Sequence, residues 1–132
     1  MSEDRAQVER RIRVSFARQG LMQTLGATLG DVSPGQVEIL LVPKREISQQ
    51  HGFVHAGAVS AIADSAAGYA ALSMMPPDRG VLTAEFKINL LAPAVGECLI
   101  ASGRSSRQAA PSRSHNPKCL PEQAGNCGLL PC

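Results

Sequence analysis

Residues 49–75 read QQHGFVHAGAVSAIADSAAGYAALSMM, a short polar loop that runs directly into a long series of small apolar residues. The loop brings two glutamines, two histidines and several backbone amides to the start of a helix predicted over residues 56–75. Asp64 is the single acid in that helix, and an unpaired carboxylate is costly to bury. Converging polar groups and one isolated carboxylate together indicate a functional site.

The predicted helix has two different faces at 3.6 residues per turn. One is a packing stripe formed by Val59, Ile62, Ala66, Tyr69 and Ala70. The other carries Asp64 among small residues, namely Gly57, Ser60 or Ala61, Ala67 or Gly68, and Ala71. Small side chains let a sheet, a second helix or a ligand approach the carboxylate closely. The alternative is an aspartate on a solvated side of the helix.

Spacing separates Asp64 from the loop. The nine residues from His55 to Asp64 span about 13 Å, or two and a half turns of helix. Asp64 therefore points away from the loop that precedes its own helix. A site that uses both must combine two subunits, so the sequence predicts a homodimer, or a dimer of dimers, with its sites on the interface.

The flanking segments predict the rest of the fold. A helix is expected from Ser2 to about Gly20, followed by a weak strand over residues 24–32, a turn at residues 33–35 and a strand over residues 36–42. Apolar and polar side chains alternate over residues 81–91, which predicts a half-buried strand, and a further strand begins at Glu97. This order predicts an α+β fold in which one long helix packs on an antiparallel sheet.

Composition narrows the classes of function. The net charge is only +2 and hydrophobic residues make up 44% of the 132 residues, so we expect a globular protein without a nucleic-acid partner. No segment approaches the roughly 18 apolar residues that span a bilayer, so no membrane partner is expected. The N-terminal residues lack the order of a secretory signal, which predicts a cytoplasmic protein with reduced thiols.

The chain changes character after residue 103. Residues 104–132 hold four basic side chains, one acid and three of the four cysteines, without a period of 2 or 3.6. We therefore divide the chain into a folded domain, residues 1–103, and an atypical tail, residues 104–132, that is expected to be disordered. No cofactor or metal is expected, because no Cys-x-x-Cys pair occurs among the tail's possible zinc ligands, His115, Cys119, Cys127 and Cys132.

Over about residues 15–103 the chain resembles the hotdog-fold acyl-CoA thioesterases of the phenylacetate-degradation (PaaI-like) type. Three features carry the resemblance: a Gly-x-x-His-(Gly/Ala)-Gly loop at residues 52–57, an acid nine residues after the histidine, and residues 82–89 followed by Leu-Ala-Pro. In that family an antiparallel sheet wraps a long helix, and two protomers build two sites. The resemblance implies this hotdog fold and the hydrolysis of acyl-CoA thioesters to free acid and CoA.

The resemblance also implies roles for individual residues. Asp64 would be the catalytic carboxylate, acting as general base on water or as nucleophile, and the Ala56 N–H would polarise the thioester carbonyl. Gln49 corresponds to an Asn or Gln near the thioester or the water, and Thr83 to a Ser or Thr that holds the water. The substrate-binding residues would be His51, His55 and Gly57. The imidazole of His55 is expected to shape the loop rather than transfer protons.

Two alternatives to an active hydrolase remain open. In a non-catalytic acyl- or CoA-binding hotdog module, Asp64 would be only structural. The second alternative is an inactive, truncated thioesterase. Family members continue after residue 103 with a turn and two further strands, and the tail of this chain does not show that pattern. The change in character there is what a reading-frame change or a diverged terminus would produce. The sheet is therefore expected to be incomplete at its C-terminal end, with an unpaired edge.

Overall fold

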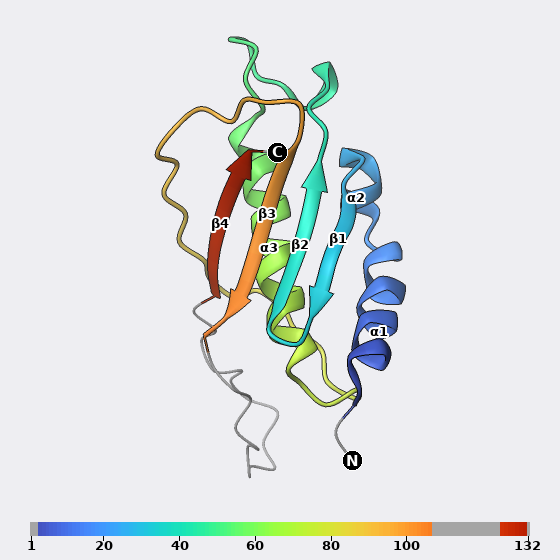
Figure 1. Cartoon of the computed structure of the whole chain (residues 1–132). Coiled ribbons are helices and arrows are strands. Elements are labelled where there is room, and N and C mark those ends of the chain that lie inside the picture. The colour runs from blue at the N-terminus through green and yellow to red at the C-terminus, as the bar shows by residue number, and fades with distance from the viewer. Residues whose placement is uncertain (1–2, 107–124, 132) are drawn as a thin grey trace.

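The computed structural model describes residues 3–106 and the backbone of residues 125–131. Along the chain its elements are α1 (Arg5–Ala17), α2 (Gly20–Leu25), β1 (Thr28–Ser33), β2 (Gln36–Leu41), the 3-10 helix η1 (Arg45–Ile47), α3 (Ala56–Ser73), β3 (Leu99–Ser105) and β4 (Gly125–Pro131). Helix α3 packs along the sheet (Figure 1). The predicted α+β class is therefore confirmed.

The sheet has the strand order β1-β2-β3-β4 in the described part of the chain, and each neighbouring pair is antiparallel. β1 and β2 form a hairpin through the predicted turn, where Gly35 has a φ of 79° that a side chain would strain. β3 then returns beside β2 after α3, with Leu99 opposite Leu41 and Arg104 opposite Gln36. The long helix thus connects two strands that are neighbours in the sheet.

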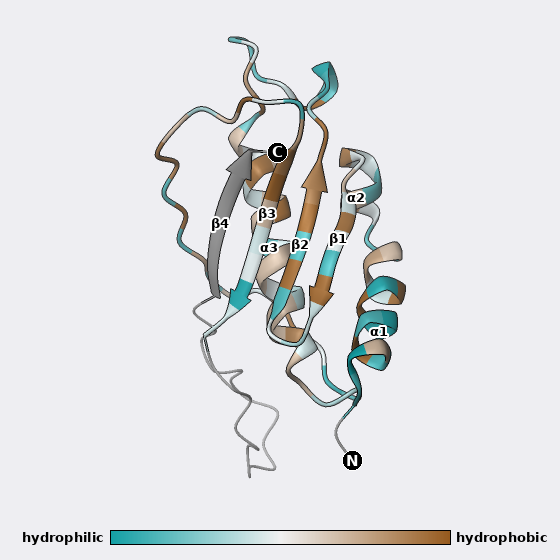
Figure 2. Cartoon of the chain, in the orientation of Figure 1, coloured by the Kyte–Doolittle hydropathy of each residue, from teal (hydrophilic) through white to brown (hydrophobic). Residues whose placement is uncertain are grey.

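The hydrophobic core lies between α3 and one face of the sheet. β2 contributes every second residue to it, and Val37, Ile39 and Leu41 are fully buried. The predicted packing stripe of α3 is confirmed, because all five of its members are buried: Val59, Ile62, Ala66, Tyr69 and Ala70. α1 adds Val8 and Ile12 to this cluster, whereas much of its remaining surface is hydrophilic (Figure 2).

The C-terminal end of α3 is held by α1. The guanidinium of Arg11 donates hydrogen bonds to the carbonyl oxygens of Leu72 and Met75, at 3.2 and 3.1 Å. Glu3 forms an ion pair of 2.7 Å with the same guanidinium. Leu72 lies in the last turn of α3 and Met75 follows its C-cap, Met74, so this contact ties α1 to the C-terminal end of α3.

Gly103 lies directly against the backbone of α3. A Cβ atom at this position would overlap the carbonyl group of Ala66 and lie 2.6 Å from the backbone nitrogen of Ala67. Ala66 is itself fully buried. The helix can therefore approach β3 this closely only because the strand carries no side chain at residue 103.

We expect Gly103→Ala to lower the free energy of unfolding by at least about 3 kcal/mol, the upper end of ordinary overpacking, because backbone atoms cannot move aside as a side chain can. Urea denaturation measures this change. Gly20→Ala is the control, since a methyl group there meets nothing within 4 Å and alanine favours a helix. Equal stabilities of the two variants would contradict the close approach.

Two predicted boundaries near the N-terminus are wrong. The N-cap of α1 is Asp4 rather than Ser2, because Asp4 forms a reciprocal capping box with Gln7. Gly20 begins the short helix α2 instead of ending the first helix. The glycine that does end a helix is Gly26, which follows α2 with a left-handed φ of 73°.

The strand predicted over residues 81–91 is also wrong. No backbone hydrogen bond is recorded for these residues within the described part of the chain, and they belong to no strand of the sheet. Figure 1 accordingly shows the connection between α3 and β3 as an irregular trace. Alternation alone does not make a strand, because each strand needs a neighbour to satisfy its N–H and C=O groups.

The backbone of Gly125–Pro131 forms β4, which pairs with β3 from Leu99↔Pro131 to Ser105↔Gly125. A disordered tail is therefore a wrong prediction for these residues, because a sheet edge supplies hydrogen bonds that composition does not reveal. β3 itself continues to Ser105, past the predicted boundary at residue 103. The cysteine and histidine side chains considered for zinc lie outside the described residues. No helix among those that are described is long and apolar enough to cross a membrane.

Candidate active site

The loop before α3 is a tight turn closed by its own polar groups. The Gln49 N–H donates to the Phe53 carbonyl at 2.8 Å, and the Gly52 N–H donates to the Gln49 carbonyl at 3.1 Å. Gly52 has a φ of 85°, which favours glycine. The side-chain oxygen of Gln49 accepts a hydrogen bond from the His51 N–H. Gln49 is consequently half-buried, whereas His51 is exposed.

His55 is the N-cap of α3. Its Nδ1 accepts a 2.8 Å hydrogen bond from the Gly57 N–H, and its carbonyl oxygen accepts from the Ala58 and Val59 N–H groups at 2.9 and 3.2 Å. The imidazole thus acts as an acceptor through Nδ1 in this cap. A Cβ atom at residue 57 would lie 3.0 Å from Nδ1. Gly57 therefore leaves room for this cap.

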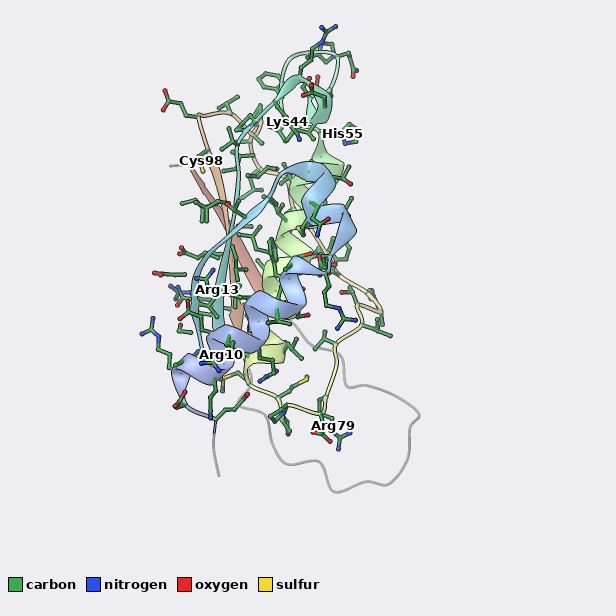
Figure 3. All side chains as sticks on the ribbon, turned by 90° about the vertical axis from the view of Figure 1, so that its right-hand side faces the viewer. Arg10, Arg13, Lys44, His55, Arg79 and Cys98 are labelled. Atoms are coloured by element: carbon green, nitrogen blue, oxygen red, sulfur yellow. The ribbon has the colours of Figure 1, made fainter. Side chains whose placement is uncertain are left out.

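Ala56 carries the one N–H in the first turn of α3 that has no recorded hydrogen-bond partner in residues 3–106. The residue is exposed. It is the first residue of α3, and the residue before it, His55, lies far from Arg79 in Figure 3. An unpaired N–H at a helix N-terminus, where the helix dipole adds positive charge, is well suited to receive a developing oxyanion.

The Asp64 carboxylate is oriented by Thr83. The Thr83 hydroxyl donates a 2.8 Å hydrogen bond to Asp64 Oδ1, and Asp64 is half-buried on α3. Neither carboxylate oxygen takes part in an ion pair within the described residues, and no donor to Oδ2 is recorded there. Oδ2 is therefore available to accept a proton from a water molecule.

These two groups remain apart within one chain. The loop residues lie at the N-terminal end of α3, namely Gln49, His51, His55, Ala56 and Gly57. The Asp64–Thr83 pair lies further along the helix. Ala56 and Asp64 are eight residues apart, which is about 12 Å along the helix axis. A carbonyl bound at the Ala56 N–H is consequently beyond hydrogen-bond reach of a water molecule on Asp64 of the same chain.

Sequence reasoning missed the detailed use of the loop's polar groups. It placed several backbone amides at the start of the helix as groups of the site, but the His55 side chain and carbonyl already engage those of residues 57–59. It also left the Gln49 side chain open, although its oxygen binds within the loop. A signal for the cap was present, since an acceptor side chain commonly precedes a helix and bonds the amide two or three residues later.

The sequence profile of the Thioesterase superfamily matches residues 51–108. The match covers the end of the loop, α3, the segment that contains Thr83, and β3. No curated protein matches this sequence.

Solved structures agree with the profile. A thioesterase family protein from Silicibacter pomeroyi is 47% identical, with a TM-score of 0.74 over 76% of this chain and 74% of that chain. The PaaI protein of the E. coli phenylacetic acid degradation operon is 18% identical, with a TM-score of 0.68 over 76% and 72%. A phenylacetic acid degradation-related protein from Ralstonia eutropha is 20% identical, with a TM-score of 0.65 over 76% and 77%. The latter two similarities concern the fold alone, and they confirm the predicted hotdog fold.

Proposed function

Because this chain belongs to the thioesterase superfamily, which supports thioester hydrolysis in general, we propose that it hydrolyses acyl-CoA to free acid and CoA. One observation carries the proposal: Asp64 is a half-buried carboxylate without an ion-pair partner in the described residues, and Thr83 holds one of its oxygens at 2.8 Å. A carboxylate in this state can take a proton from water or attack a carbonyl itself.

The proposed reaction begins with the thioester carbonyl at the Ala56 N–H. Asp64 removes a proton from water as the water oxygen attacks the carbonyl carbon, and the carbonyl oxygen becomes an oxyanion. One preorganised donor of this type typically contributes about 3–4 kcal/mol to lowering the barrier. The intermediate then collapses, the C–S bond breaks, and the proton passes to the CoA thiolate. If Asp64 acts as the nucleophile, its carboxylate oxygen bonds to the carbonyl carbon, the C–S bond breaks and CoA leaves as the thiolate. Water then hydrolyses the mixed anhydride to free acid and the Asp64 carboxylate, and a proton released in this step passes to the thiolate.

The remaining loop residues would bind the substrate. Gln49 has its side-chain NH₂ group left to donate to the thioester or to the attacking water, because only its oxygen is recorded as bonded to His51. His51 is exposed at the same end of α3 and can contact the CoA portion. We give His55 and Gly57 the role of shaping the site, since their mutual hydrogen bond fixes the start of the helix.

We further propose that each complete site combines the loop of one protomer with the Asp64–Thr83 pair of its partner. The reason is the separation of about 12 Å along α3, which one thioester group cannot bridge. A second copy that places its own Asp64 opposite the loop would bring the acid and the amide donor to the same carbonyl. The protein would then act as a homodimer or a dimer of dimers.

The experiment that tests the function is thiol release from short-chain, medium-chain and aryl acyl-CoAs by the purified full chain. We expect turnover on at least one of these classes. Binding of acyl-CoA without turnover would instead support the non-catalytic module, because the Ala56 N–H can bind a carbonyl without any chemistry. Acyl groups on acyl carrier protein, assayed in parallel, distinguish the two carriers.

A further inference from the structure

Gln19 has a side chain that contacts α3 rather than capping its own helix. It is the N-cap of α2, yet its side chain makes no capping hydrogen bond there. Instead its amide oxygen Oε1 accepts a 3.2 Å hydrogen bond from the hydroxyl of Ser65, on α3. The NH₂ group of the same amide has no recorded partner in the part of the chain that the structure describes. Gln19 is half-buried and therefore holds one unused donor beside α3.

This donor lies next to the candidate catalytic acid. Ser65 directly follows Asp64 on α3, so their side chains diverge by about 100° around the helix axis. Ala61 and Gly68 are each a neighbour of both on the helix surface, at spacings of three and four residues. Both are small, and a Cβ atom added at Gly68 would meet nothing within 4 Å. The helix surface between the carboxylate and Ser65 is therefore open at Gly68.

The acyl part of a substrate suits this open surface. In the proposed reaction the attacking water lies on Asp64, so the thioester carbon lies close to that carboxylate. This carbon is trigonal, and its oxygen and sulfur are directed to the Ala56 N–H and the CoA-binding loop of the other protomer. The third substituent is the acyl chain, which must point away from that loop. The surface beside Asp64 at Gly68 is free to receive it.

We propose that Gln19 selects acyl groups that carry a hydrogen-bond acceptor close to the thioester, such as a 3-oxo group. Its NH₂ group donates to that oxygen, while the bond from Ser65 holds the other end of the amide. A saturated acyl chain offers no acceptor, so it would remove water from the NH₂ group without replacing the hydrogen bond. The proposal rests on the proposed function, because it takes acyl-CoA as the substrate and Asp64 as the reaction centre.

Binding of two CoA thioethers, which cannot be hydrolysed, tests this preference on the purified full chain. S-(3-oxobutyl)-CoA carries the acceptor, S-butyl-CoA lacks it, and isothermal titration calorimetry measures Kd for each. We expect the oxo ligand to bind the wild-type chain about three- to tenfold more tightly, the usual gain from one hydrogen bond. In Gln19→Glu this preference should disappear, because a carboxylate can still accept from Ser65 but cannot donate to the ligand.

A second variant and a control complete the binding test. Gln19→Met removes both polar atoms at similar size and should also abolish the preference. Gln23→Glu is the matched control, because Gln23 is exposed on the same helix α2 and its NH₂ group donates to the Ala17 carbonyl at 2.6 Å. This control should keep the wild-type ratio of the two Kd values, and circular dichroism verifies that each variant is folded.

The proposal is overturned if the wild-type chain binds both thioethers equally or binds neither. It is also overturned if either Gln19 variant keeps the wild-type ratio, or if Gln23→Glu loses it. Hydrolysis of 3-oxobutanoyl-CoA and butanoyl-CoA is measured separately. A chain that shows the binding preference but hydrolyses neither thioester would count against the proposed function alone, whereas turnover with equal binding of the thioethers would count against the role of Gln19 alone.

Discussion

Asp64→Asn is expected to lower kcat for acyl-CoA hydrolysis by about 10²–10⁴-fold, the usual contribution of a positioned general base. An amide neither accepts the water proton nor attacks the carbonyl as a nucleophile. The substitution nearly preserves shape, and the oxygen of the new side chain can still accept the hydrogen bond from Thr83. We therefore expect the melting temperature and the affinity for acyl-CoA to change little.

Thiol release under saturating acyl-CoA measures this effect, and Asp78→Asn is the matched control. Asp78 lies in the exposed turn after α3, where its only ion pair within the described residues, with Arg79, has a distance of 4.0 Å. The same chemical change there should leave kcat at the wild-type level. If the Asp64→Asn variant keeps kcat within a few-fold of wild type, Asp64 is a structural residue and the proposed mechanism is wrong.

Ala56→Pro is expected to lower kcat by about 10²–10³-fold, because proline removes the one N–H assigned to the oxyanion. The fold should tolerate the change. Ala56 is the first residue of α3, where proline is common, since its fixed φ suits the helix. The preceding residue, His55, already has the extended ψ of 136° that proline requires of its neighbour.

The control for Ala56→Pro is Arg5→Pro, which places proline at the first position of α1. Asp4 precedes it with an extended ψ of 164°, so the backbone is equally suitable. We expect both variants to melt near the wild-type temperature, and only Ala56→Pro to lose hydrolysis. Wild-type kcat in the Ala56→Pro variant would show that the oxyanion is bound elsewhere.

The local elements of this fold could be predicted because their signals lie within short stretches of sequence. Helix α3 was expected over residues 56–75 and extends from Ala56 to Ser73, with its packing stripe buried as predicted. β2 was expected over residues 36–42 and extends from Gln36 to Leu41. A helix forms its hydrogen bonds within itself, and β2 follows a turn signal with a run rich in Val, Ile and Leu, residues that favour strands.

The family and the candidate residues also followed from sequence. The sequence spacing predicted that more than two turns of helix lie between the loop and Asp64. In the structure these turns belong to the continuous helix α3. The resemblance identified Thr83 as the counterpart of a Ser or Thr that holds the attacking water. It could not reveal that the Thr83 hydroxyl donates directly to Asp64, because the two residues are 19 positions apart in sequence and only the path of the connecting chain decides the contact.

Only the tertiary structure decided the contacts between residues that are far apart in the sequence. In the structure Gly125–Pro131 pairs with β3, whereas residues 81–91 have no neighbouring strand in the described chain. Yet apolar and polar residues alternate more clearly over residues 81–91 than over residues 125–131. The tertiary structure also showed that the Ala56 N–H has no recorded partner among residues 3–106, while His55 engages the Gly57 N–H. The sequence by itself determined α1, α3 and the α+β class, because helical hydrogen bonds are local. The pairing of strands depends on residues that are distant in sequence, and so does the presence or absence of a hydrogen-bond partner for the Ala56 N–H. Only the folded chain brings such residues together.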